Sequence, residues 1–218
     1  MAKIVGIRQQ RVQYFYDTLF RARGSLTTAI GQQTSLFSAA TPGDLLRTNL
    51  QTAGQLASDQ TFLTYAVRHE LYLRPTGASN SAGGNGLANQ TDIDLRSAGL
   101  FRDIIHHTTY QFKVDSKVEF EGFWAMTPAG GGTWGFLSDS VDVNFVNGEP
   151  SSRAIYVLPL PIAVTQRQAI ALIETFGDIP SGGGTGAAAV TILTNLNNFQ
   201  GVKIGRGYID GYHSREVS

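Results

Sequence analysis

The chain has 218 residues, a formal net charge of zero and no cysteine. This length suits one domain of ordinary size, or one β domain with an added arm, and the absence of cysteine excludes a disulfide framework and a thiolate metal site. Charged residues make up only 16% of the chain, against about 25% in typical globular domains. A surface this poor in charge is weakly protected from association, so we expect much of it to be buried against other chains.

The first residues, MAKIVGIRQQRV, lack the apolar core of a signal peptide. No run in the sequence approaches the roughly 18 apolar residues of a membrane-spanning helix. We therefore expect a protein that is made in the cytoplasm without a signal peptide.

Charge is unevenly distributed along the chain. Residues 1–43 carry five cations and one acid, Asp17, which leaves a net charge of +4. Apolar residues at positions 12, 15, 16, 19 and 20 fit helical spacing, so residues 8–23 are expected to form a short amphipathic helix, with a strand as the alternative. Residues 24–43 are small and polar, and we expect them to form an extended arm that a neighbour orders.

Residues 61–74, reading TFLTYAVRHELYLR, form the first strong predicted strand. Period-two alternation is typical of a half-buried strand, and here one face is nearly all apolar, with Leu63, Tyr65, Val67, His69, Leu71 and Leu73. Pro75 is expected to end the strand, because proline cannot donate to the ladder. Residues 76–90 then indicate a surface loop, and residues 92–105 a short helix or a loose turn.

Residues 110–126, reading YQFKVDSKVEFEGFWAM, carry the clearest alternation in the chain. The break at Asp115-Ser116-Lys117 has turn-tolerant chemistry, so the stretch predicts a β-hairpin. If Val114 pairs with Val118, then Phe112 lies opposite Phe120. Aromatic pairs of this kind contribute roughly 0.2–1 kcal/mol beyond their burial.

Further strands are predicted at residues 134–146, 168–176, 187–196 and 202–209, and an edge strand or corner at residues 153–164, which contain Pro159 and Pro161. About eight strands joined by glycine-rich loops indicate an all-β fold. We predict a single antiparallel jelly-roll sandwich over residues 45–218 with an extended N-terminal arm over residues 1–44, and at most one or two short helices.

No catalytic, cofactor-binding or metal-binding constellation is predicted. His106 and His107 are adjacent, so on a strand they would face opposite ways, and His69 and His213 are lone and are interpreted as surface or loop histidines. Nucleophile elbows and phosphate-binding loops are absent from the sequence. Glu119 and Glu121 share one strand face and are interpreted as solvated. These observations favour a protein that is not an enzyme and has no small-molecule substrate.

Three stretches together resemble the major capsid proteins of tailless icosahedral bacteriophages. They are the basic arm at residues 1–43, the stretch LLRTNLQTAGQLASDQTFLTYAVRHELYL at residues 45–73, and the proline-punctuated stretch YVLPLPIAVTQRQAIALIETFGD at residues 156–178. The resemblance implies a structural coat subunit of a virion that self-assembles into an icosahedral shell, with copies of itself and other coat proteins as partners. The alternative is a lectin-like or receptor-binding sandwich, in which Trp124 and Trp134 would form an aromatic platform.

The arm's arginines are the candidate contact residues, at Arg8, Arg11, Arg21 and Arg23. Guanidinium groups suit phosphates, so these residues would contact the genome or the headgroups of an internal membrane. The competing hypothesis is that they pair with the net-acidic body of a neighbouring subunit. Subunit contacts are expected to use residues 24–43 and the glycine loops.

Overall fold

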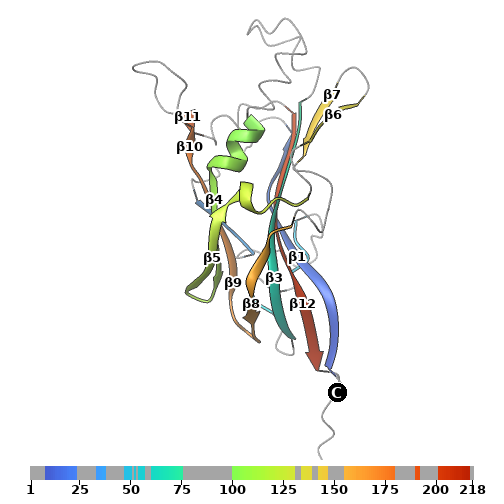
Figure 1. Ribbon diagram of the computed structural model, residues 1–218, viewed down its shortest axis with the longest axis vertical. Coiled ribbons are helices and arrows are strands. Elements are labelled where there is room, and N and C mark those ends of the chain that lie inside the picture. The colour runs from blue at the N-terminus through green and yellow to red at the C-terminus, as the bar shows by residue number, and fades with distance from the viewer. Residues whose placement is uncertain are drawn as a thin grey trace, which may run out of the picture.

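The computed structural model describes residues 8–23, 33–37, 47–50, 52, 54–56, 60–75, 100–130, 134–138, 142–146, 155–179, 190–191 and 201–216. In these ranges the chain forms two antiparallel sheets that pack face to face, with one short helix at residues 100–107 (Figure 1). The predicted all-β sandwich is confirmed.

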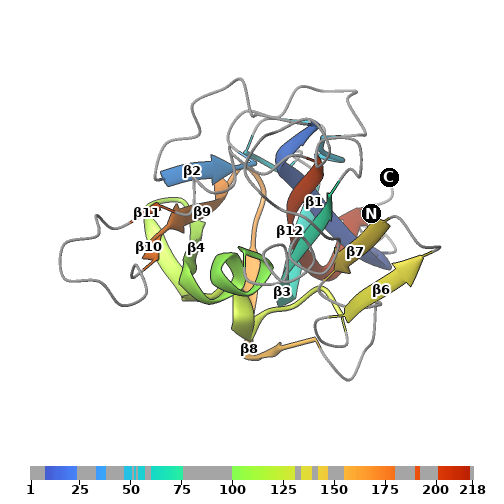
Figure 2. The same cartoon turned by 90° about the horizontal axis from the view of Figure 1, so that it is seen from above.

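The large sheet runs in the order β1 (Arg8–Arg23), β12 (Gly201–Glu216), β3 (Gln60–Pro75), β7 (Asp142–Val146) and β6 (Trp134–Ser138), and β8 (Val157–Val164) also pairs with β3. The small sheet runs in the order β2 (Gln33–Leu36), β9 (Ile170–Phe176), β4 (Thr108–Val114) and β5 (Lys117–Phe123). A third pair joins β10 (Asp178–Ile179) to β11 (Val190–Thr191). Seen from above, β1 and β2 lie at one open side of the sandwich, and β8 lies at the other (Figure 2).

The core lies between the sheets because every second side chain of strands such as β4 and β9 is buried between them. On β9 the residues Ile170, Leu172 and Phe176 are all at most 4% exposed, and burying each such side chain stabilises the fold by about 1.5–3 kcal/mol. The sheets approach closely at Gly207 of β12, where an added Cβ would lie 2.6 Å from Leu172 Cδ2. Phe101 and Ile104 of the 100–107 helix are fully buried in the same core, as expected for a short helix in this region.

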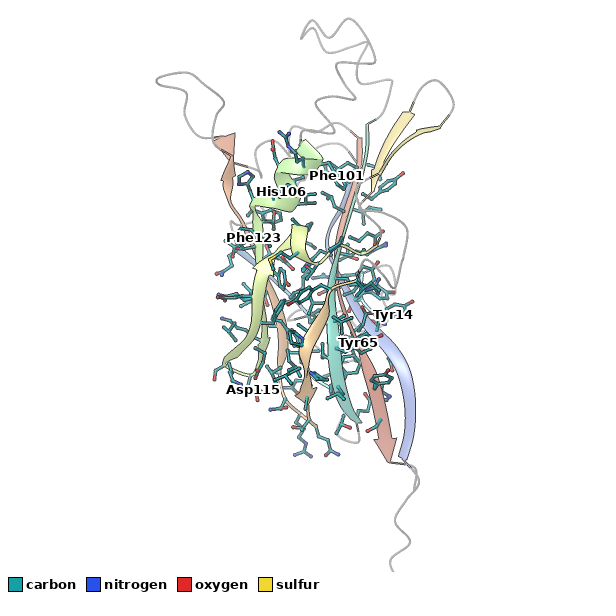
Figure 3. All side chains as sticks on the ribbon, viewed as in Figure 1. Tyr14, Tyr65, Phe101, His106, Asp115 and Phe123 are labelled. Atoms are coloured by element: carbon teal, nitrogen blue, oxygen red, sulfur yellow. The ribbon has the colours of Figure 1, made fainter. Side chains whose placement is uncertain are left out.

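Strands β4 and β5 form the predicted hairpin. Phe112 lies opposite Phe120 as predicted, but Val114 pairs with Lys117 and not with Val118, because the register shifts between Phe112 and Lys113. Asp115 occupies the turn with a φ of 54°, at the hairpin tip in Figure 3. Its carboxylate accepts the Ala169 N–H at 2.9 Å, which fixes the turn to the start of β9.

Strand β3 confirms the predicted strand and its end at Pro75, but one prediction for its faces is wrong. The pairing with β12 shifts register between Thr64 and Ala66, where the opposing residues are Gly211 and Asp210. Because of this bulge, the side chains before Thr64 point to the opposite faces of the sheet from those that the alternation after Ala66 predicts. Phe62 is therefore buried, whereas Leu63, expected inside, is 40% exposed.

Residues 8–23 form strand β1, so the helix prediction is wrong and the strand alternative is confirmed. The reason is tertiary, because β1 pairs with β12 along its whole length, from Arg8 opposite Glu216 to Arg23 opposite Val202. Phe15 is 4% exposed and faces the core, while Tyr14 is 52% exposed on the outer face. The predicted boundary between arm and sandwich, at residues 44 and 45, lies outside the described residues, as does most of the 24–43 segment except β2.

Other strand predictions are met in part. The single strand predicted at residues 134–146 is the two-stranded hairpin β6–β7. Strand β8 carries Pro159 and Pro161, and among the described strands it pairs only with β3, which confirms the predicted edge strand. Strand β12 extends from Gly201 to Glu216, beyond the predicted end at residue 209. Of residues 187–196, the described part contains only β11.

The Asn49 side chain covers part of the free edge of β1 by making the hydrogen bonds that the backbone of a neighbouring strand would make. The Asn49 amide accepts the Tyr16 N–H at 2.8 Å and donates to the Tyr14 carbonyl at 2.7 Å. The Thr48 hydroxyl donates to the Tyr16 carbonyl at 2.8 Å. Satisfying these backbone groups within the chain protects this part of the edge from pairing with another strand.

Replacing Asn49 by alanine is expected to lower the free energy of unfolding by about 1–2 kcal/mol, because two hydrogen bonds to backbone groups are lost. Urea unfolding followed by circular dichroism measures the change, with the exposed Gln55→Ala as the matched control. A loss no larger than that of the control would show that Asn49 does not hold this edge.

Candidate functional site

The most elaborate polar arrangement in the described residues lies in the middle of the core. His69 of β3, in the large sheet, and Glu174 of β9, in the small sheet, are joined by a hydrogen bond of 3.0 Å between Nε2 and Oε1. The other ring nitrogen of His69 lies 2.8 Å from the Thr127 hydroxyl. The second carboxylate oxygen of Glu174 accepts the indole N–H of Trp124 at 2.6 Å. We call these four residues the buried bridge.

Aromatic rings enclose the buried bridge. The indole of Trp124 stacks on the His69 imidazole, with ring centroids 5.1 Å apart. The Tyr110 ring lies 4.4 Å from that of His69. Burial raises the pKa of Tyr110 well above its usual value, so its hydroxyl stays neutral at physiological pH. The bridge therefore has an apolar wall, in which its hydrogen bonds are strong and its polar groups are costly to leave unpaired.

The segment after η1 (Trp124–Met126) also completes the large sheet. The Thr127 carbonyl accepts the His69 N–H at 2.7 Å, and the Ala129 N–H donates to the His69 carbonyl at 3.0 Å. Residues 127–129 thus pair with β3 between the stretches that pair with β8 and with β7. The backbone and the side chain of His69 are held by the same short segment.

Thr127, His69 and Glu174 are connected in the order hydroxyl, imidazole, carboxylate, which is the order of a hydrolytic triad. A triad must present its hydroxyl to a substrate. Here Thr127, His69 and Glu174 are each 0% exposed. The geometry therefore supports a structural role, in which the bridge ties the two sheets together and sets their relative position.

The interpretation of His69 as a surface or loop histidine is wrong. The sequence contained a usable signal, since His69 lies on the apolar face with Val67 and Leu71, and Glu174 lies on the apolar face of β9. A lone polar residue on a buried face needs a partner. The other histidines do not join the bridge, because His106 and His107 lie in the 100–107 helix and His213 lies near the end of β12. Among the described residues no cluster of histidine and acidic residues could hold a metal ion.

The outer face of the large sheet carries tyrosines and two ion pairs. Tyr208 lies 6.2 Å from Tyr14 and 6.1 Å from Tyr16 between ring centroids, and the Arg68 guanidinium lies 4.8 Å above its ring. Arg68 makes a bidentate contact with Asp210, and Arg206 lies 3.3 Å from Glu70. This face is mixed in charge and rich in flat rings, which suits contact with another macromolecule.

The four predicted contact arginines are not one cluster. Arg8 and Arg11 lie at the start of β1, and Arg21 and Arg23 lie at its end. Ten residues separate Arg11 from Arg21, which corresponds to about 33 Å along a strand. The side chains of these arginines lie outside the described part of the structure, so their contacts stay a prediction.

Two further predictions concern surface residues. Trp124 is 1% exposed, so it is not available for the aromatic platform of the lectin-like alternative, and the side chain of Trp134 lies outside the described part. Glu119 accepts a hydrogen bond from Lys117 at 2.9 Å, and Glu121 accepts one from Gln111 at 3.2 Å. Glu121 is exposed, as the solvated interpretation requires, whereas the Glu119 side chain is only 22% exposed.

Lys203 of β12 is a buried cation that sequence analysis missed. It is 0% exposed, and the residues paired with it in the sheet are Ala22 of β1 and Leu73 of β3. Burial lowers the pKa of Lys203 from 10.5 to about 8, because desolvation disfavours the charged ammonium. The lysine therefore costs stability whenever it is protonated in the folded state.

The free energy of unfolding is expected to rise by about 1–2 kcal/mol between pH 8 and pH 9.5 because of Lys203. In this window the unfolded chain still binds the proton that the folded chain has released, so raising the pH favours folding. Below pH 8 both states hold the proton and the cost is constant. Denaturant titrations across this range check the slope, which should be absent in Lys203→Met. Equal slopes in the two proteins would contradict the assignment.

No protein-family model, no curated protein and no solved structure matches this chain. Within the described ranges, no helix has the length and apolar character needed to cross a membrane. The fold and the bridge define the class of the protein as an all-β sandwich with a polar tie between its sheets.

Proposed function

We propose that this chain is a structural coat subunit that self-assembles into an icosahedral viral shell. The supporting observation is the strand order. Apart from the hairpins β6–β7 and β10–β11, the described strands form one sheet of β1, β12, β3 and β8 and a second of β2, β9, β4 and β5. The chain passes between these sheets repeatedly, and this order supports the jelly roll, a fold that recurs in viral capsid proteins.

Surface chemistry supports the same proposal. Large apolar side chains such as Val157 and Leu160 are 56% and 80% exposed, and exposed apolar groups that gather in one place mark contact sites. The proposed partners are copies of this chain in the virion, other coat proteins and, through the arginines at the two ends of β1, the genome or an internal membrane.

Size-exclusion chromatography with light scattering, followed by electron microscopy, tests the proposal. Shells or stable oligomers are expected from the purified protein at micromolar concentration. A protein that stays monomeric at every concentration would contradict a coat function.

A sugar-binding sandwich is the second candidate, because jelly rolls also serve as lectins. The tyrosines on the outer face of the large sheet favour it, since flat rings stack on sugar rings. A monomer that binds a glycan array, and that loses binding on Tyr14→Ala, would favour this alternative.

A further inference from the structure

The two open sides of the sandwich differ in how well the described residues cover them. On the β1–β2 side, Leu50 and Leu56 are each 3% exposed and fill the gap, and Asn49 covers the edge of β1. Asp17 accepts the Phe37 N–H at 2.6 Å and ties β1 to the end of β2. The chain closes this side with its own residues.

On the opposite side, the described structure leaves a groove between β5 of the small sheet and β8 of the large sheet. Its volume is about 490 Å³, and its lining is apolar, with Phe120, Leu158 and Pro161 among its residues, apart from one acid, Glu119. Of the eight large hydrophobic side chains that are exposed in the described part of the chain, five lie on β5, η1 and β8, namely Val118, Phe123, Met126, Val157 and Leu160. Figure 3 shows Phe123 on the small-sheet side of the sandwich and Tyr14 on the large-sheet side.

We propose that this β5–β8 side is covered by the same side of a second copy of the chain, related by a two-fold axis. The proposal rests on the coat function proposed above and names one contact through which the subunits associate. In a two-fold contact each copy presents the same patch, so the apolar residues of one copy meet those of the other.

The charges beside the groove favour an antiparallel two-fold arrangement. Strand β5 carries Lys117 at its start and Glu121 near its end, and the Lys117 side chain is 74% exposed. When two β5 strands approach antiparallel, the Lys117 end of each copy lies at the Glu121 end of the other. Two Lys117–Glu121 contacts then form while Lys117 keeps its hydrogen bond to Glu119 of the same copy, and only Glu119 meets a like charge, whereas a parallel approach would place all three like charges together.

Strand β8 favours a contact made by side chains over one made by backbone hydrogen bonds. Pro159 and Pro161 have no N–H group to donate, so the free edge of β8 is a poor template for an added strand. Leu160 lies between these prolines and is 80% exposed. The contact on this strand is therefore made by side chains, with Leu160 as its apolar anchor.

Two substitutions separate this contact from general changes of the surface. Leu160→Glu places a charge in the apolar patch, and Gln55→Glu places one at an exposed residue beside Leu56, on the β1–β2 side. We expect Leu160→Glu to raise the dissociation constant of the two-fold dimer at least tenfold in light scattering at matched concentrations, and Gln55→Glu to leave it unchanged. Because Leu160 is so exposed, its variant should keep the far-UV circular dichroism and the thermal midpoint of the unchanged protein.

Single cysteines test the symmetry, since the chain has no cysteine of its own. Leu160→Cys and Val118→Cys should each form disulfide-linked dimers under mild oxidation, because a residue near a two-fold axis meets its own copy. Gln55→Cys, at an exposed residue on the β1–β2 side, serves as the control and should not form such a dimer.

If the protein assembles but neither cysteine links and Leu160→Glu assembles normally, the two-fold contact is overturned and the coat function stands. If the unchanged protein is monomeric throughout, the coat function and this contact both fall.

Discussion

Replacing Glu174 by alanine is expected to lower the free energy of unfolding by about 3–5 kcal/mol, because two buried polar groups lose their carboxylate partner and a cavity is left in the core. The substitution leaves the Trp124 indole N–H and the His69 Nε2 without the carboxylate that joins them. It also opens a cavity at a residue that is 0% exposed. Chemical denaturation monitored by the fluorescence of the tryptophans measures the loss.

Glu174→Gln is the matched control for this experiment. Glutamine has the same length and keeps one oxygen acceptor, so we expect it to cost about 1–2 kcal/mol, the price of one impaired hydrogen bond. Glu121→Ala, on the exposed face of β5, should change stability by less than about 0.5 kcal/mol. If Glu174→Ala costs no more than Glu121→Ala, the bridge does not hold the two sheets together.

A second large effect is expected at Gly211, which lies in the bulge between β12 and β3. A Cβ at this position would overlap the Leu63 carbonyl oxygen and lie 2.6 Å from Phe62 Cζ. The carbonyl belongs to the sheet backbone and cannot move aside as a side chain can. Gly211→Ala is therefore expected to lower the free energy of unfolding by about 3 kcal/mol, as overpacking does in a tightly filled core.

Gly122 of β5 provides the control for Gly211. A Cβ there would lie 3.4 Å from the Tyr110 hydroxyl oxygen and 3.6 Å from Met126 Sδ, which are close to ordinary contact distances. Since alanine is favoured over glycine in a strand interior by about 0.5–1 kcal/mol, Gly122→Ala should be neutral or slightly stabilising. Comparable midpoints for the two variants in thermal unfolding would refute the steric argument at Gly211.

The strands were predictable wherever alternation is local. The β4–β5 hairpin, the edge position of β8 and the end of β3 at Pro75 follow from period-two patterns, from turn chemistry and from the missing N–H of proline. Such signals depend on a few adjacent residues and on which face of the strand meets solvent. They do not depend on which strands are neighbours in the sheet.

The prediction of a helix at residues 8–23 was wrong because the strand that pairs with β1 is distant in the sequence. Its apolar residues fit helical spacing, and nothing within residues 8–23 shows that a partner strand lies near the far end of the chain. The pairing of Phe15 with Ile209 joins residues that are almost the whole chain apart. Long-range pairing supplies backbone hydrogen bonds that no local pattern encodes, and it overrode the helical spacing.

By itself, the sequence determined that the chain is an all-β sandwich rich in loops and poor in surface charge, because alternation and composition are local properties. Only the tertiary structure decided that His69 faces the core and meets Glu174, 105 residues away in the sequence, and that the bulge in β3 turns Leu63 outward. Burying His69 requires a hydrogen-bond partner, and the other sheet supplies that partner. A bulge shifts the alternation of the strand, so the residues before the bulge point to the opposite faces from those that the pattern after it predicts. Both depend on the register between distant strands, which is fixed by the packing of the whole core.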